Sequence, residues 1–193
     1  NQYLWVRDAV RLEAEVIRDN LLAVSGELNR DIGGPPFFPE VDDAVMRRAP
    51  TWWDPSPPEE RHRRTIYMLK YRSLELPFLK AFDSASPNLS CPVRETTSVT
   101  PQVFSLFNSK FVLERSQALA DRIRVEVGDD LDRQIEQAFQ WAFQRLPSDR
   151  ERERCLSFLD RSRDSIRTRV LASASAGASP AELSDDDRLT DLC

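Results

Sequence analysis

The clearest hydrophobic pattern of this chain lies near its N-terminus. Apolar side chains recur there every three or four positions, at Val10, Ala14, Ile17, Leu21, Val24 and Leu28. This spacing places all of them on one face of an amphipathic helix. We predict that the helix begins after Asp8, its N-cap, and ends at Gly26.

A second helical pattern begins at Thr100. Thr100 is the expected cap, and Pro101 occupies the first helical position, where a missing N–H costs nothing. The apolar side chains that this helix is expected to carry are Val103, Phe104, Phe107, Phe111 and Val112.

Two further helices are predicted near the C-terminus. The first has an apolar stripe and stops at Pro147; the stripe consists of Leu131, Ile135, Ala138, Ala142 and Leu146. A capping box over residues 148–151 (SDRE) begins the second. The side chains that it is expected to bury are Cys155, Leu156, Leu159 and Ile166.

The segment between the first and second helices contains a dense run of prolines. Residues 33–58 hold Gly33, Gly34 and seven of the thirteen prolines, with Phe and Trp residues interleaved. Prolines at this density exclude regular helix, so a packed irregular loop is expected. The glycine pair could cradle a phosphate, but no GxGxxG or Walker pattern accompanies it.

The remaining middle of the chain gives weaker signals. Thr65–Ser73 is rich in β-formers and predicts a short strand, with a second strand near Val93–Val99. Leu76–Phe82 predicts a helical turn that ends at Asp83. The expected fold is therefore mainly α: an irregular helical domain with a long Pro-rich loop and room for one short two-stranded β-ribbon.

Composition divides the chain into three parts. Residues 1–171 are predicted to form a single helical domain, truncated at its N-terminus. Residues 172–183 are rich in Ala and Ser and predict a linker. Ser184 and three following aspartates predict the start of a terminal helix over 184–193, cut by the chain end.

Charge and length limit the function classes. The 193 residues carry a formal net charge of −5, which argues against nucleic acid as a partner. No apolar run approaches the roughly 18 residues that span a bilayer, so no membrane span is expected. Only Lys70, Lys80 and Lys110 are lysines; the other basic residues are arginines. Arginine suits bidentate pairing with carboxylates, although codon bias in a GC-rich genome explains the excess equally well.

Residue types that usually perform catalysis are sparse. His62 is the single histidine and lies between two arginines, whose charge opposes its protonation, so a surface histidine is expected. Cys91, Cys155 and Cys193 form no CxxC pair, and a structural zinc site needs about four Cys or His ligands. A disulfide stays open as an alternative, since the sequence does not say which cysteines would pair, but buried free thiols are the simpler expectation. We assign no catalytic, metal-binding or cofactor-binding residue.

Three blocks of sequence together carry a family resemblance. They are RLEAEVIRDNLLAVSGELNRDIGGPPFFP, RRTIYMLKYRS and FDSASPNLSCPVRETTSVTPQVFSLFNSKFVLE, followed by QAFQWAFQRLPSDRERERCLSFL and LTDLC. Their order and spacing resemble the C-terminal domain of large planctomycete multidomain proteins, the domain of unknown function numbered fifteen fifty-three. The chain departs from the family after Pro101, where QVFSLFNSK is bulkier than the usual Leu- and Ala-rich helix.

The resemblance implies a context and a set of polar positions. Parent proteins of the family often carry a cytochrome-c-like domain upstream and are thought to be exported, which implies a periplasmic or cell-surface location. Any haem would belong to that upstream domain, since this chain has no haem motif. The family's typical polar positions correspond to Glu15, Arg18, Asp19, Arg72, Asp83, Cys91 and Arg94.

Several of these polar residues are expected to form a partly buried charged network that links the first helix to the middle segment. Its candidate members are Glu15, Arg18, Asp19, Arg72, Asp83 and Arg94. Such a network predicts a non-catalytic accessory module that packs against neighbouring domains of its parent protein. A weaker alternative is support of electron transfer beside a haem domain.

A different class of function starts from Trp52 and Trp53. Adjacent indole rings can stack on sugars, which would make the chain a carbohydrate-binding or polysaccharide-degrading module. A packed aromatic pair is the simpler expectation for the same two residues.

Overall fold

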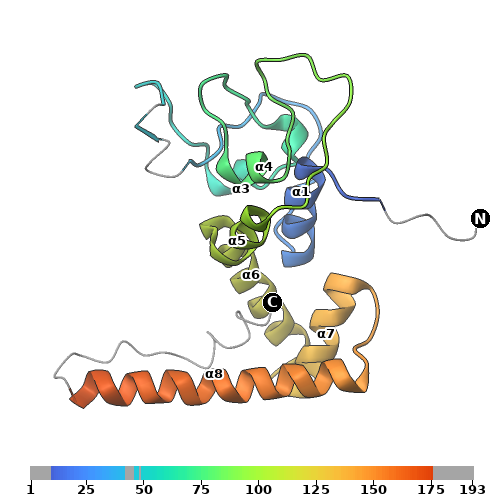
Figure 1. Cartoon of the computed structure of the whole chain (residues 1–193), viewed down its shortest axis with the longest axis vertical. Coiled ribbons are helices and arrows are strands. Elements are labelled where there is room, and N and C mark those ends of the chain that lie inside the picture. Colours follow the sequence, from blue (N-terminus) through green and yellow to red (C-terminus); the bar gives the residue numbers. More distant parts are fainter. Residues whose placement is uncertain (1–9, 42–45, 48, 176–193) are drawn as a thin grey trace, which may run out of the picture. The chain divides into compact units, whose positions relative to one another are not determined.

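The computed structural model describes the backbone of residues 10–41, 46–47 and 49–175, and side chains as far as residue 162. This part of the chain is mainly α-helical, as predicted (Figure 1). Its helices are α1 (Ala14–Ser25), α3 (Pro58–Arg61), the 3-10 helix η1 (Thr65–Tyr67), α4 (Pro77–Ala81), α5 (Thr100–Asn108), α6 (Lys110–Val127), α7 (Leu131–Phe143) and α8 (Asp149–Ser175). None of the helices described is long and apolar enough to cross a membrane.

The chain divides into two compact units, and the domain predicted for residues 1–171 contributes to both. The first comprises residues 1–22 and 28–109, and the second comprises residues 23–27 and 110–193. The last turn of α1 therefore belongs to the second unit. The helix α1 begins at Ala14 and not directly after Asp8 as predicted, since residues 10–13 are not helical. Asp8 itself, most of the predicted linker and the predicted terminal helix lie outside the described residues, as does the side chain of Ile166.

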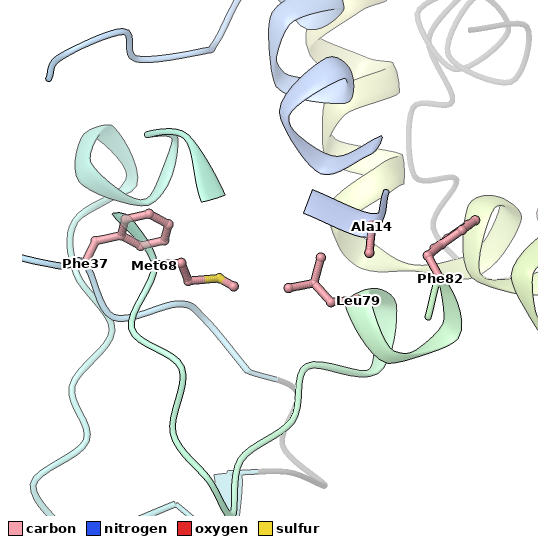
Figure 2. Close-up of a cluster of buried hydrophobic side chains, with 5 residues drawn as sticks. All are labelled: Ala14, Phe37, Met68, Leu79 and Phe82. Carbon is pink, nitrogen blue, oxygen red and sulfur yellow. The ribbon is translucent and has the colours of Figure 1, made fainter. Parts of the chain in front are cut away.

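The core of the first unit joins segments that are far apart in the sequence. Figure 2 shows its five buried side chains, which are Ala14, Phe37, Met68, Leu79 and Phe82. They come from α1, the Pro-rich loop, the segment after η1, and α4 with the residue that follows it. The Pro-rich loop is thus packed into the core through Phe37, which is 1% exposed.

The predicted strand over Thr65–Ser73 is wrong, and the described residues contain no β-ribbon. Thr65–Tyr67 forms η1 instead, and Phe37 makes an isolated bridge with Met68. The Phe37 N–H donates to the Tyr67 carbonyl at 3.0 Å, and the Leu69 N–H donates to the Phe37 carbonyl at 2.9 Å. Prolines on both sides of Phe37 lack the N–H that would extend a ladder, so pairing stops after one residue.

The expected second strand at Val93–Val99 is also absent, because this segment is irregular. The helical turn predicted over Leu76–Phe82 is confirmed as α4. The cap of α5 lies one residue earlier than predicted, at Val99, whose N–H donates to the Gln102 side chain at 3.4 Å.

The second unit is built from α6, which packs on α7, and α7, which packs on α8. Its core contains Leu119, Ala120, Ile123 and Ala138. The predicted capping box of α8 is confirmed, since the Ser148 N–H and hydroxyl both donate to Glu151. The helix α7 ends before Pro147, because Gln144 adopts a left-handed conformation with φ 56°.

The expectation of buried thiols is wrong for Cys91, and several apolar side chains of α5 lie at the surface. Val103, Phe104 and Phe107 are exposed. Cys91 is a free, exposed thiol, whereas Cys155 is free and half-buried, and burial raises its pKa. At α1, Gly26 has φ +84° and ends the helix as predicted.

Candidate functional site

Three polar residues share one face of α1. Glu15, Arg18 and Asp19 lie at helical positions i, i+3 and i+4, so their side chains neighbour one another. They meet the irregular middle segment of the first unit. The intrahelical pairing of Glu15 with Arg18 that the spacing allows is replaced by contacts with residues more than forty positions away.

Arg18 holds the segment before η1 through backbone carbonyls. Its guanidinium donates to the carbonyls of Arg61 at 2.5 Å and Arg63 at 3.1 Å. It also donates to the Thr65 hydroxyl at 3.1 Å. The side chain is only 8% exposed, and the planar fork of arginine suits several acceptors at once.

Asp19 completes this contact from the same helix face. Its carboxylate accepts the Thr65 N–H at 2.8 Å and the Thr65 hydroxyl at 2.6 Å. Because Thr65 is the first residue of η1, Asp19 satisfies an N–H that a short helix leaves without an internal partner. Asp19 also lies 3.6 Å from the Arg18 guanidinium.

Glu15 forms the charged part of the site. Its carboxylate accepts from Arg94 at 2.6 Å and from Lys70 at 2.8 Å. Burial raises the pKa of Glu15, but the hydrogen bonds from Arg94 and Lys70 outweigh it and lower the pKa to about 2. The carboxyl is therefore ionised at neutral pH and serves as an anchor, not as a proton donor.

Asp83 and Arg72 lie outside these contacts. Asp83 has φ 62° and accepts the Thr97 N–H at 2.7 Å and the Thr97 hydroxyl at 2.9 Å. The backbone hydrogen bond from Thr97 is the main reason that its pKa is lowered. Arg72 is exposed, and its backbone carbonyl accepts from Asn88. Of the six predicted residues, Arg18 and Asp19 thus share Thr65, Glu15 pairs with Arg94, Asp83 holds a separate turn, and Arg72 is exposed.

Arg63 is a structural residue that the sequence analysis did not select. Its guanidinium donates to the carbonyls of Gly33 and Pro35 and lies 4.3 Å from the centre of the Tyr67 ring. Gly33 and Gly34 both have positive φ, near +84°, which turns the loop toward this cation. Gly33 and Arg63 are 30 positions apart in the sequence, so no local signal joined them. The role of the glycine pair here is to shape the Pro-rich loop.

Trp52 and Trp53 belong to a cluster of four aromatic rings. Trp53 is 6% exposed and meets Phe38 edge to face at 5.2 Å between ring centres. Trp52 is 58% exposed, and Phe38 and Tyr71 contact it at 6.2 and 5.8 Å. These distances are those of rings in direct contact, so the cluster is packed and leaves no gap between its rings for a sugar.

A small hollow lies beside this cluster, lined by Met68, Lys70, Tyr71, Leu79 and Lys80 among others. Its volume is about 40 Å³, which admits a few water molecules, whereas ligand pockets usually measure about 300–1,000 Å³. Among the residues that the structure describes, no three His, Cys, Asp or Glu side chains gather to hold a metal ion.

The Glu15 contacts predict a specific pH dependence. The folded pKa of about 2 lies below the ordinary 4.5, so the stabilisation is complete above about pH 4.5 and is lost as the pH falls toward 2. We expect Glu15→Gln to cost about 1–2 kcal/mol of unfolding free energy at pH 7, allowing for solvent screening, and almost nothing at pH 2. Urea unfolding followed by circular dichroism from pH 2 to 7 measures this.

The control for that series is Glu59→Gln, since Glu59 is exposed on α3. Its unfolding free energy should match the unsubstituted chain at every pH. An equal loss from Glu15→Gln at pH 2 and pH 7 would show that the carboxylate contacts are not what stabilises the fold.

Comparison with protein families gives a match over most of the chain. A family model described as "Protein of unknown function (DUF1553)" matches residues 1–159, in agreement with the resemblance of the sequence blocks. No curated protein and no solved structure matches the chain.

Proposed function

Because the chain belongs to the DUF1553 family of proteins of unknown function, we propose a role from its geometry: it is a non-catalytic accessory module that binds a neighbouring domain of its parent protein. The observation that carries this proposal is where the polar residues of α1 make their hydrogen bonds. Arg18, Asp19 and Glu15 direct their hydrogen bonds to groups within the first unit.

A catalytic or ligand-binding group needs a different environment. Catalytic carboxyls commonly have a raised pKa and face a cleft, where they can exchange protons with a substrate. Glu15 has a lowered pKa and two cationic partners, and Asp83 is held by Thr97. The hollow near Lys70 and Lys80 is also too small for a metabolite. These properties favour a scaffold that presents a surface over a site that transforms a substrate.

The proposed setting follows the family resemblance. The parent would be an exported planctomycete-type protein with a cytochrome-c-like domain upstream, acting in the periplasm or at the cell surface. Any haem would then be held upstream of this module, and the module would stabilise or orient the domain next to it.

The test pairs this chain with the polypeptide encoded immediately upstream in the same gene. We expect calorimetry to show one-to-one association and the melting temperature of the upstream domain to rise by several degrees when the chain is added. Absence of both binding heat and a shift in melting temperature would contradict the proposal.

A substitution at Asp83 distinguishes a structural role of this residue from a role in ligand binding. Asp83→Asn should lower the melting temperature of this chain and leave its affinity for the upstream polypeptide within about twofold of the original. Loss of affinity without loss of stability would instead place Asp83 in a binding site.

Carbohydrate binding is the second candidate, and the exposed ring of Trp52 is the observation that favours it. Its neighbour Trp53 is buried in the aromatic cluster and offers no second stacking platform. Binding to a glycan array that disappears in Trp52→Ala would favour this role over the accessory one.

A further inference from the structure

The helix α5 buries a polar side chain against its unit and exposes its apolar side chains, which is the reverse of the usual arrangement. Gln102 is 7% exposed, and its side chain donates to the Thr97 carbonyl at 3.0 Å. Val103, Phe104 and Phe107 are 52%, 62% and 73% exposed. A surface helix normally buries its apolar side, so these side chains are placed for contact with something outside the first unit.

This apolar surface is extended by two neighbouring residues. Val99 before the helix and Leu106 within it are 47% and 38% exposed. Together with Val103, Phe104 and Phe107 they form what we call the α5 face. From these exposed fractions the face presents roughly 450 Å² of apolar area, which is within the range of functional patches on soluble proteins.

The α5 face is also free of charge. Residues 96–109, fourteen in succession, include no Asp, Glu, Lys or Arg in a chain of which 31% is charged. A partner recognised by charge, such as a nucleic acid or an acidic peptide, finds no complementary group here. The surface therefore fits an uncharged apolar partner.

We propose that the α5 face is a self-association surface on which a second copy of this chain docks through its own α5 face. In a two-fold symmetric pair, each residue near the axis meets its counterpart, so charged residues there would repel one another. The α5 face avoids that repulsion, although each chain carries a net charge of −5. The helix α5 has nine residues, and its projecting Phe104 and Phe107 can fit beside the smaller Val99 and Val103 of an antiparallel copy.

The area decides how strong this association is. Two α5 faces bury roughly 900 Å² in total, less than the about 1,200–2,000 Å² of a stable protein interface. The dimer is therefore weak and reversible, with a dissociation constant on the order of 10⁻⁴ M. Because this docking needs no neighbouring domain, it goes beyond the proposed accessory role and can fail or succeed independently of it.

The test is sedimentation velocity of the whole chain from about 5 µM to about 500 µM. We expect a monomer at the lowest concentration and a growing dimer fraction at the highest. Phe104→Glu and Phe107→Glu should each raise the dissociation constant by about tenfold or more, since they introduce like charges across the axis. The control is Val125→Glu, which changes an 87% exposed apolar residue of α6 and should leave the dimer unaffected.

Three results would overturn the proposal. They are a monomer at every concentration, a dimer that survives both phenylalanine substitutions, and an equal loss in the Val125→Glu control. Flotation of the monomer with neutral phosphatidylcholine vesicles, abolished by Phe107→Glu, would assign the α5 face to a lipid surface instead. Circular dichroism of each variant verifies that the helices are retained.

Discussion

Replacing Arg18 with alanine is expected to lower the unfolding free energy by about 3–5 kcal/mol. The substitution removes a buried cation that donates to two backbone carbonyls and to the Thr65 hydroxyl. The carbonyls of Arg61 and Arg63 and the Asp19 carboxylate would lose the charged donor beside them. Urea unfolding at pH 7, followed by circular dichroism, measures the loss.

The matched control is Arg72→Ala, which removes an exposed arginine of the same unit. Its effect should be within about 0.5 kcal/mol. Arg18→Lys should recover only part of the loss, because a lysine ammonium lacks the planar fork that serves several acceptors. Equal stabilities for the Arg18→Ala and Arg72→Ala variants would show that the carbonyl contacts of Arg18 do not hold the unit together.

The second large effect is expected from Phe37→Ala, at about 3–5 kcal/mol. Phe37 is 1% exposed and lies in the cluster of Figure 2 with Met68 and Leu79. Truncation leaves a cavity at the point where the Pro-rich loop enters the core. The same residue pairs its backbone with Tyr67 and Leu69, so loosening its ring also weakens that attachment.

Phe107→Ala provides the comparison, since it removes the same ring from a 73% exposed position. Measured in dilute solution, where the chain is monomeric, it should change the unfolding free energy by less than about 0.5 kcal/mol. Phe37→Leu should fall between the two, because leucine fills much of the space. A Phe37→Ala variant as stable as Phe107→Ala would place the Pro-rich loop outside the cooperative core.

The periodic parts of the fold could be predicted from the sequence because their signals are local. The burial of Ile135 and Ala138 and the capping box from Ser148 to Glu151 depend on residues a few positions apart, and the structure has both features. Leu131 and Leu146, at the two ends of the predicted stripe, are exposed. The end of α1 at Gly26 is local in the same way, since only the conformation of one residue decides it.

The irregular middle could not be predicted because its contacts are not local. The β-formers of Thr65–Ser73 indicate a strand, but a strand needs a partner, and the neighbouring backbone at Phe37 is bordered by prolines. The backbone of Thr65 is held by Asp19 instead, 46 positions earlier. No period or spacing in the sequence reports such a contact.

In the candidate network, too, the local feature could be predicted and most of the long-range contacts could not. That Glu15, Arg18 and Asp19 share a face follows from helical spacing alone. Of their partners, Arg94 was among the predicted members, whereas the carbonyls, the threonine and Lys70 were not. At α5 the apolar period predicted a helix, but the period does not say which side of the helix is buried.

Arg18 and Arg63 bind backbone carbonyls through their guanidinium groups, and a guanidinium group is not deprotonated in proteins. Carbonyl oxygens do not titrate either. The attachment of α1 to the residues before η1, and of the glycine turn to Arg63, should therefore be indifferent to alkali. A lysine in either place would lose its proton as the solution became basic, and its hydrogen bonds to the carbonyls would weaken.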